Sequence, residues 1–130
     1  MTSFTTLRVA DAALVQAPDG GDVRILPVLD GGSMATFELA PGETSRAVTH
    51  RTVEEIWYVM RGRGEMWRRQ VDRDEVVTLE EGVCLTIPLG THFQFRSFGP
   101  GPLTAVAITM PPWPNEDEAY RVDGPWWATV

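Results

Sequence analysis

The sequence predicts an all-β domain whose short strands close into a barrel or jelly roll. Segments rich in β-branched, aliphatic and aromatic residues recur along the chain, and clusters of glycine, proline and aspartate separate them. No stretch keeps a helical hydrophobic period over three turns. A chain of 130 residues suits one such domain, which would bury roughly two thirds of the surface that its unfolded form exposes.

The strands are expected in a regular series after an N-terminal arm. Residues 1–20 form this arm, which leads into a proline, aspartate and glycine turn at residues 17–21. Two aliphatic segments on either side of the turn at residues 30–33 predict a hairpin. Residues 21–110 thus form the barrel of a single domain that spans residues 1–130. The expected strands cover residues 23–29, 34–39, 47–50, 56–60, 65–71, 75–79, 83–87, 93–98 and 103–110.

Residues 111–130 form a C-terminal tail rich in proline and tryptophan. Its prolines cannot donate ladder hydrogen bonds, and residues 115–118 can cap a short helical turn. Trp126 and Trp127 lie at the end, where tryptophans are expected to dock on another surface. The tail covers either one end of its own barrel or a second subunit.

A single cysteine, Cys84, lies in the apolar run at residues 83–87. The continuous run predicts a strand buried on both faces, so we expect Cys84 to pack in the core. One cysteine cannot form an internal disulfide, which is typical of a reducing, cytoplasmic setting. The chain has no apolar run of about 18 residues and no N-terminal export signal, so neither a membrane span nor secretion is expected.

The charge balance excludes some partners. The chain carries 18 acidic against 11 basic residues, a formal net charge of -7. Such a field repels phosphate backbones and anionic lipid surfaces. We therefore expect a small organic ligand, and neither nucleic acid nor a membrane.

Residues 41–64 carry a spaced pattern in which Gly42, His50, Glu55 and Gly62 stand at fixed offsets. This pattern resembles the first motif of the cupins, G-x5-H-x-H-x4-E-x6-G, with Val48 in place of the first histidine. The second cupin motif, G-x5-P-x-G-x2-H-x3-N, follows in part. Its glycines and proline match Gly82, Pro88 and Gly90, whereas Phe93 stands at its histidine and Ser97 at its asparagine.

The resemblance implies a double-stranded β-helix, the jelly-roll barrel of the cupins. It also implies a divalent metal held by three histidines and a glutamate, of which this chain keeps only His50 and Glu55. An open catalytic site for iron, zinc or manganese needs at least three imidazole or carboxylate ligands. His92, one residue before the family position, could restore a third ligand, but only if a bulge turned it inward.

His50 and Glu55 are the candidate catalytic residues. An apolar wall would raise the pKa of Glu55, and the two groups could then divide the roles of acid and base. Strand alternation turns Trp57 to the same side as Glu55. Trp57, Phe93 and Phe95, with His92, are the candidate substrate-binding residues, although the aromatic rings could instead fill the barrel as its core.

Three functions remain open from the sequence. The first is an enzyme of isomerase, cyclase or lyase type that uses His50 and Glu55 without a tightly bound metal. The second is a metal-dependent dioxygenase that uses His50, Glu55 and His92 as ligands of iron, zinc or manganese. The third is a non-catalytic module that binds or senses a ligand.

We also expect a homodimer, because a barrel of short strands leaves free edges. The N-terminal arm or the C-terminal tail could cover these edges across subunits.

Overall fold

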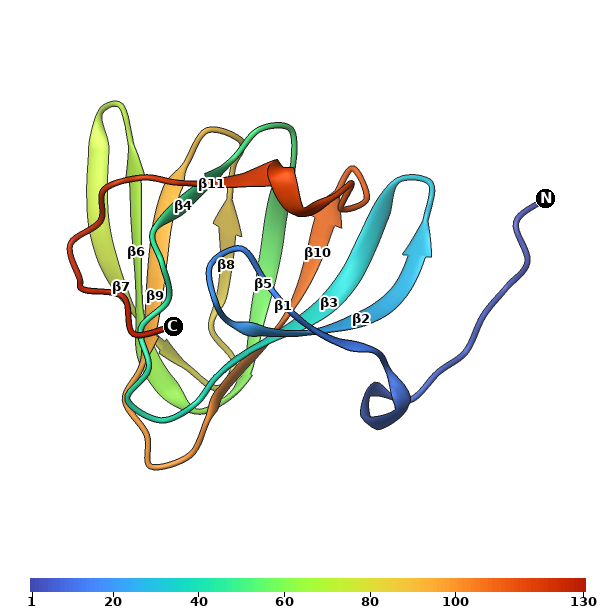
Figure 1. Ribbon diagram of the computed structural model, residues 1–130, viewed down its shortest axis with the longest axis horizontal. Helices are drawn as coiled ribbons and strands as arrows, with labels where there is room; N and C mark the ends of the chain where they lie inside the picture. The colour runs from blue at the N-terminus through green and yellow to red at the C-terminus, as the bar shows by residue number, and fades with distance from the viewer.

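Two antiparallel sheets make up the computed structural model, which describes residues 1–130. The order of strands is β1-β2-β3-β10-β5-β8 in one sheet and β11-β4-β9-β6-β7 in the other, and Figure 1 shows the two sheets on opposite sides of the molecule. Both helices are three-residue 3-10 turns, so no helix has the length and hydrophobicity to cross a bilayer. The elements are η1 (Val9–Asp11), β1 (Leu14–Gln16), β2 (Asp22–Leu29), β3 (Gly32–Leu39), β4 (Val48–His50), β5 (Glu54–Arg61), β6 (Arg63–Gln70), β7 (Arg73–Glu80), β8 (Cys84–Ile87), β9 (His92–Ser97), β10 (Leu103–Met110), η2 (Glu116–Glu118) and β11 (Ala119–Arg121).

The expected all-β jelly roll is confirmed, and each of the nine expected strands is present within a few residues. The hairpin forms between β2 and β3, with the turn at Asp30 and Gly31. Two short strands were missed. β1 pairs with β2 and β11 pairs with β4, and each has only three residues, too few to show an alternating pattern.

The core lies between the facing sides of the two sheets. Along β5 the buried residues alternate strictly with exposed ones, so Trp57 and Val59 point inward while Tyr58 points out. Phe93 and Phe95 of β9 also point into the core, from the opposite sheet. Burying each such aromatic or aliphatic side chain stabilises the fold by roughly 1.5–3 kcal/mol. The same alternation that builds the core therefore turns Glu55 inward with Trp57.

Gly62 of the first motif sits where only glycine fits. Its φ is +91°, in the left-handed region, and a Cβ at this position would lie 2.4 Å from the carbonyl oxygen of Pro102. The turn between β5 and β6 thus passes directly over the start of β10. The spacing of the motif reflects this close approach as well as the site.

The expectation for Cys84 is wrong. β8 is the last strand of its sheet and pairs only with β5, and its residues alternate between exposed and buried. Leu85 and Ile87 face the core, whereas Cys84 is exposed on the outer face. The run here belongs to an edge strand whose outer residues, Cys84 and Thr86, are exposed, and not to a strand covered on both faces.

The C-terminal tail packs on its own barrel. β11 extends the five-stranded sheet beside β4 (Figure 1). Beyond it, the backbone of Trp126 exchanges two hydrogen bonds with the side chain of Gln94, at 2.9 and 3.2 Å. The Trp126 ring also covers the guanidinium of Arg96, with 4.1 Å between the Arg96 Cζ and the ring centroid. Trp127 does not dock, because 94% of it is exposed.

Candidate functional site

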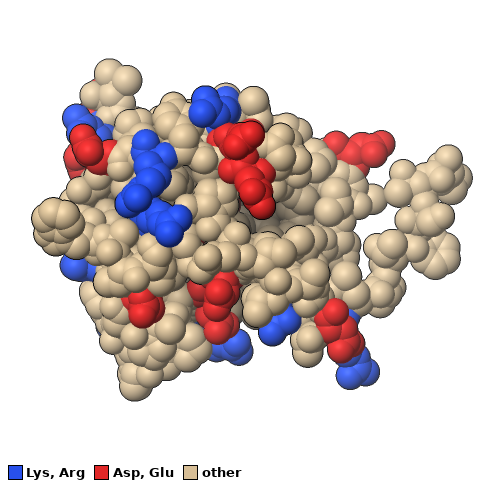
Figure 2. All heavy atoms as spheres, in the orientation of Figure 1, with Lys and Arg blue, Asp and Glu red and all other residues tan.

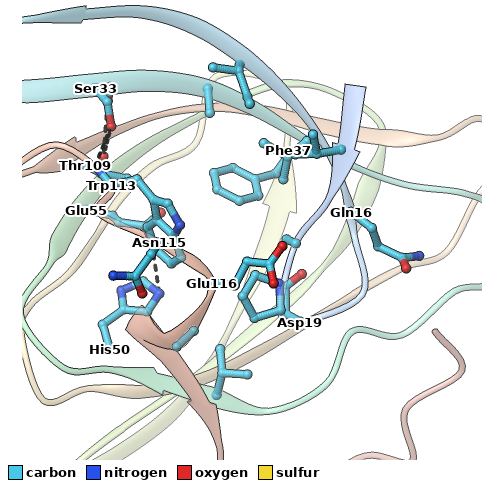
Figure 3. A pocket seen from close by; sticks show the side chains of 18 of the residues that line it. Gln16, Asp19, Ser33, Phe37, His50, Glu55, Thr109, Trp113, Asn115 and Glu116 are labelled. Atoms are coloured by element: carbon cyan, nitrogen blue, oxygen red, sulfur yellow. Dashed lines mark hydrogen bonds and ion pairs between the residues drawn. The ribbon is translucent and has the colours of Figure 1, made fainter. Parts of the chain in front are cut away.

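A cavity of about 340 Å³ opens between the sheets. Strands from both sheets line it, together with the turn after β1 and the tail segment before β11, and Figure 3 shows the polar residues arranged around an apolar interior. Its volume lies within the range of about 300–1,000 Å³ that is usual for small-molecule sites. The lining residues are Val15, Gln16, Ala17, Pro18, Asp19, Val23, Ile25, Val28, Ser33, Met34, Ala35, Phe37, Val48, His50, Glu55, Trp57, Phe93, Thr109, Trp113, Asn115, Glu116 and Ala119.

His50 and Glu55 meet in this cavity. His50 ends β4 and Glu55 is the second residue of β5, so the short connection between the strands brings the two side chains together. The Nε2 atom of His50 lies 3.3 Å from Oε2 of Glu55, with side chains that are 4% and 2% exposed. The motif spacing thus placed both residues in one site.

The connection between them is held by Glu118, a residue that the sequence did not single out. Its carboxylate accepts hydrogen bonds from the backbone N–H groups of Thr52 and Val53, at 2.7 and 3.0 Å, and from the Thr52 hydroxyl. Its backbone carbonyl accepts from the N–H of Arg51 at 2.9 Å. Burial raises the pKa of Glu118, but these hydrogen bonds outweigh it and hold the pKa below its ordinary value.

Trp57 orients the glutamate. Its indole Nε1–H donates to Oε1 of Glu55 at 2.9 Å. The indole itself is fixed by stacking on Phe37, with ring centroids 5.2 Å apart, and by an edge contact with Phe95 at 5.1 Å. One carboxyl oxygen is therefore bound by Trp57, which leaves Oε2 for His50.

Burial makes both members of the pair favour their neutral forms. It raises the pKa of Glu55 to about 8, opposed by the Trp57 hydrogen bond and assisted by the nearby Asp19 carboxylate. It lowers the pKa of His50, opposed by the negative charge of Glu118 and a backbone contact with Val53. At neutral pH the pair is thus a carboxylic acid beside a neutral imidazole.

The hydrogen bonds assign the two protons of this neutral pair. Since Oε1 of Glu55 accepts from Trp57, the carboxyl proton belongs on Oε2 and points at Nε2 of His50. The imidazole proton then belongs on Nδ1. This atom is buried and makes no hydrogen bond of ordinary geometry, although the Val53 backbone lies close enough to oppose the shift in the His50 pKa. An unpartnered buried donor beside a cavity is a position where a ligand acceptor gains free energy.

Two aromatic rings frame His50. Phe93, at the family position of a metal-binding histidine, meets the imidazole edge-on at 5.2 Å, and Trp113 from the tail does the same from its own side at 5.2 Å. Trp113 was not predicted as a site residue. Its place depends on the path of the tail, which no local pattern encodes.

Two of the four expected substrate-binding residues do not line the cavity. Phe95 lies beneath Trp57 and belongs to the core. His92 is half-buried at the start of β9, opposite Arg69, and it does not line the cavity that holds His50 and Glu55. β9 pairs with β6 without the bulge that would turn His92 inward.

The donor set at this site does not fit a metal. Val48 and Phe93, which occupy the family's ligand positions, both line the cavity and supply no lone pair. No group of three or more His, Cys, Asp or Glu side chains in the structure is arranged to hold a metal ion. His92 therefore does not complete the alternative ligand set with His50 and Glu55.

A second acid, Asp19, also lines the cavity. It lies in the turn after β1, where its Oδ1 accepts a hydrogen bond from the N–H of Gly21 at 2.9 Å. Burial raises its pKa to about 6, although this hydrogen bond and the positive charge of Arg46 oppose the shift. In the sequence, this aspartate is predicted only as a residue of the turn at residues 17–21.

Comparisons with known proteins agree with the fold. The model of the cupin domain matches residues 35–109. The protein MJ1618 of Methanocaldococcus jannaschii, which is uncharacterised, is 31% identical over 85 residues, and the match covers 65% of this chain and 65% of that protein's length.

Solved structures of the same fold share little sequence with this chain. A single-residue variant of Streptomyces Pac13 with uridine has a TM-score of 0.72 and 19% identity, covering 94% of this chain and 92% of Pac13. Pac13 is described as a nucleoside dehydratase. Oxalate decarboxylase from Bacillus subtilis has a TM-score of 0.76 and 16% identity, covering 94% of this chain and 33% of the decarboxylase. At these identities the likeness concerns the fold alone.

Proposed function

We propose, from the premise that the chain belongs to the cupin family, that it is an enzyme acting on a small organic molecule by acid–base chemistry. The family assignment is plain, because the matched residues 35–109 make up more than half of the chain. The proposed reaction is of isomerase, cyclase or lyase type and uses no tightly bound metal. The catalytic residues would be His50 and Glu55.

The observation that carries this proposal is the buried His50 and Glu55 pair in an otherwise apolar cavity. A carboxyl group and an imidazole are costly to bury, and apolar side chains would fill the same space without that cost. Their pKa values are shifted in the direction that keeps an acid and a base neutral together. Such shifts are typical of groups that exchange protons with a substrate.

The pair can move one proton out and take one back. A substrate oxygen accepts the proton of His50 Nδ1, and the Oε2 proton of Glu55 then passes to Nε2 and restores the neutral imidazole. Glu55, now a carboxylate, removes a proton from a carbon or oxygen of the substrate and returns to its acid form. His50 is left with its proton on Nε2 and regains the starting tautomer by proton exchange with water before the next turnover. The two transfers balance, as an isomerisation or the loss of water requires.

Trp113 is proposed to admit the substrate to His50. Because Nδ1 is buried, an acceptor can reach it only after a neighbouring side chain moves. Trp113 is only half-buried and comes from the proline-rich segment that precedes η2, so it can shift without breaking the sheet. The structure of a Pac13 variant with uridine supports a ring-containing ligand for a cavity of this fold.

Hydrogen exchange into a panel of compounds tests the proposal. Uridine and a set of small β-hydroxy ketones would be incubated with the protein in D2O and chelator, and mass spectrometry would follow deuterium uptake and water loss. We expect at least one compound to react, and His50→Gln and Glu55→Gln each to slow that reaction by about 100-fold or more. Glu54→Gln, on the exposed neighbour of Glu55, is the matched control and should leave the rate unchanged.

Three results would contradict the proposal. Reaction that survives in both variants would exclude the pair, and reaction only after addition of iron, zinc or manganese would favour the dioxygenase alternative. Binding in the cavity without reaction of any compound would favour the non-catalytic alternative.

The remaining expectations are a homodimer and a cytoplasmic location. The exposed, unpaired Cys84 supports a reducing environment. The outer face of the six-stranded sheet carries the exposed residues Ile56 and Tyr58, which supports association through that face.

A further inference from the structure

The ionisable residues that line the cavity, apart from His50, are all acidic. They are Asp19, Glu55 and Glu116, and neither arginine nor lysine is among the lining residues. Figure 3 shows Asp19 and Glu116 across the cavity from His50, and Figure 2 shows acidic side chains beside a hollow in the face that it draws. A negatively charged ligand would find no cation here to replace its lost hydration.

Asp19 is held in place but only partly neutralised. Its Oδ1 accepts from Gly21, and this is the one hydrogen bond that its side chain makes. Arg46, whose positive charge opposes the shift in the Asp19 pKa, makes no ion pair with it. The Arg46 guanidinium instead donates to the carbonyl oxygens of Pro18 and Val130, at 3.3 and 3.0 Å. The second carboxylate oxygen therefore has no partner of its own within the protein.

The neutral polar groups that line the cavity add no positive charge to it. The hydroxyl groups of Ser33 and Thr109 are hydrogen-bonded to each other, and the Asn115 carbonyl oxygen accepts from the backbone of Asp117. Most of the remaining wall is aliphatic or aromatic. Aromatic faces also attract cations.

We propose that the cavity binds an organic molecule with an apolar, ring-containing body and a cationic or uncharged polar end, and that Asp19 binds a hydrogen-bond donor of that molecule. A protonated amine is the preferred donor, because it forms a charge-assisted hydrogen bond with a carboxylate. The proposal deepens the proposed function and rests on it in placing the substrate in this cavity. It does not depend on proton transfer by His50 and Glu55.

Matched probes that differ in charge test the ligand class. Tryptamine, tryptophol and indole-3-acetate share an indole ring and carry a cationic, neutral and anionic end, and phenethylamine, phenylethanol and phenylacetate repeat the series with a smaller ring. Their dissociation constants would be measured at pH 7.5 by calorimetry or ligand-observed NMR. We expect the amines to bind most tightly, the alcohols next, and the acids about tenfold or more weaker than the amines.

Asp19→Asn tests the residue. Asparagine keeps the oxygen that accepts from Gly21, so the turn should be retained, which circular dichroism and the thermal midpoint would verify. We expect this variant to weaken amine binding by about tenfold while alcohol binding changes by less than about twofold. Asp22→Asn is the control. Asp22 is exposed and lies outside the cavity, and its substitution removes the same charge.

Several outcomes would overturn the proposal. These are acids that bind as tightly as amines, an amine preference that Asp19→Asn leaves unchanged, and no binding of any amine or alcohol at millimolar concentration. The same titrations on His50→Gln and Glu55→Gln separate the two proposals. A charge preference that persists in these variants while their catalysis is lost would support both proposals. A charge preference in a parent protein that catalyses no reaction would refute the acid–base function and leave the ligand class standing.

Discussion

Glu55 carries the largest pKa shift in the cavity, and its proton links the stability of the fold to pH. Its pKa rises from the ordinary value of 4.5 to about 8 because the carboxyl is buried. The folded state therefore holds a proton that the unfolded chain releases above pH 4.5. The resulting stability is fully present below about pH 4.5 and is lost progressively as pH rises to about 8.

Replacing Glu55 with glutamine should remove this dependence. Glutamine keeps the size and an oxygen for Trp57 but cannot ionise, so we expect Glu55→Gln to gain stability relative to the parent as pH rises from 5 to 8.5. The difference should reach a few kcal/mol at the upper end. Thermal or urea unfolding at a series of pH values measures it. Asp19 and His50 titrate in both proteins, so their contributions largely cancel in the difference between the two free energies of unfolding. A difference that stays constant across the pH range would refute the raised pKa of Glu55.

The ligand positions occupied by Val48 and Phe93 predict the metal content. Because neither side chain can donate a lone pair and His92 does not line the cavity, we expect protein purified without chelator to contain far less than one equivalent of iron, zinc or manganese. Elemental analysis by mass spectrometry measures this. Near one equivalent of metal that is lost in His50→Ala would contradict the account, and the dioxygenase alternative would then lead.

At the scale of elements, the connection between β4 and β5 fixes the site. Residues 51–53 join His50, at the end of β4, to Glu54, at the start of β5. Three hydrogen bonds to the Glu118 carboxylate hold this segment. Glu118 is only 3% exposed and comes from η2, far along the chain. The tail thus acts as a brace for the segment that sets the distance between the two candidate catalytic groups.

Glu118→Ala should loosen this brace. It leaves the N–H groups of Thr52 and Val53 without partners, so we expect a loss of roughly 2–4 kcal/mol in the free energy of unfolding. The signals of His50 in NMR spectra should also broaden or shift, as the loop gains freedom. Asp117→Asn is the control, because the Asp117 side chain is exposed and makes no hydrogen bond to the loop. Unchanged stability in Glu118→Ala would exclude the bracing role.

The elements that the sequence predicts are those with a local signal. Alternation placed β5 and β9, and the motif spacing brought His50 to Glu55. An apolar run could not reveal that β8 lies at an edge, because the run looks the same whether one face or both are covered, and Cys84 was misplaced for that reason. Asp19, Trp113 and Glu118 reach the site through turns and the tail, whose paths depend on long-range contacts and leave no period in the sequence.

At the scale of the whole molecule, one outer sheet face offers a surface for a second copy. Ile108 on β10 pairs with Met34 on β3 and with Ile56 on β5, and Tyr58 follows on β5. Met34 also borders the cavity. Met34, Ile56 and Tyr58 are exposed. Exposed apolar rows of this kind are typical of interfaces, and a symmetric pair of such faces would bury both.

The homodimer prediction can be tested on this face. Light scattering at micromolar concentration should give twice the chain mass of 14.4 kDa. Ile56→Asp should shift the mass to that of the monomer, because it places a charge in the row. Val76→Asp, on an exposed residue of β7 in the other sheet, is the control and should remain dimeric. A monomeric parent protein would refute the prediction outright.

The protonation states of His50 and Glu55 decide whether this molecule holds an acid–base pair. NMR titration of the folded protein, with 13C-labelled glutamate side chains and 15N-labelled histidine rings, reads both groups directly. We predict a protonated Glu55 with an apparent pKa near 8 and a neutral His50 at pH 7, with the imidazole proton on Nδ1. An ionised Glu55 facing an imidazolium at pH 7 would contradict this prediction, because the shared proton would then lie on His50 and burial would not be holding both groups neutral.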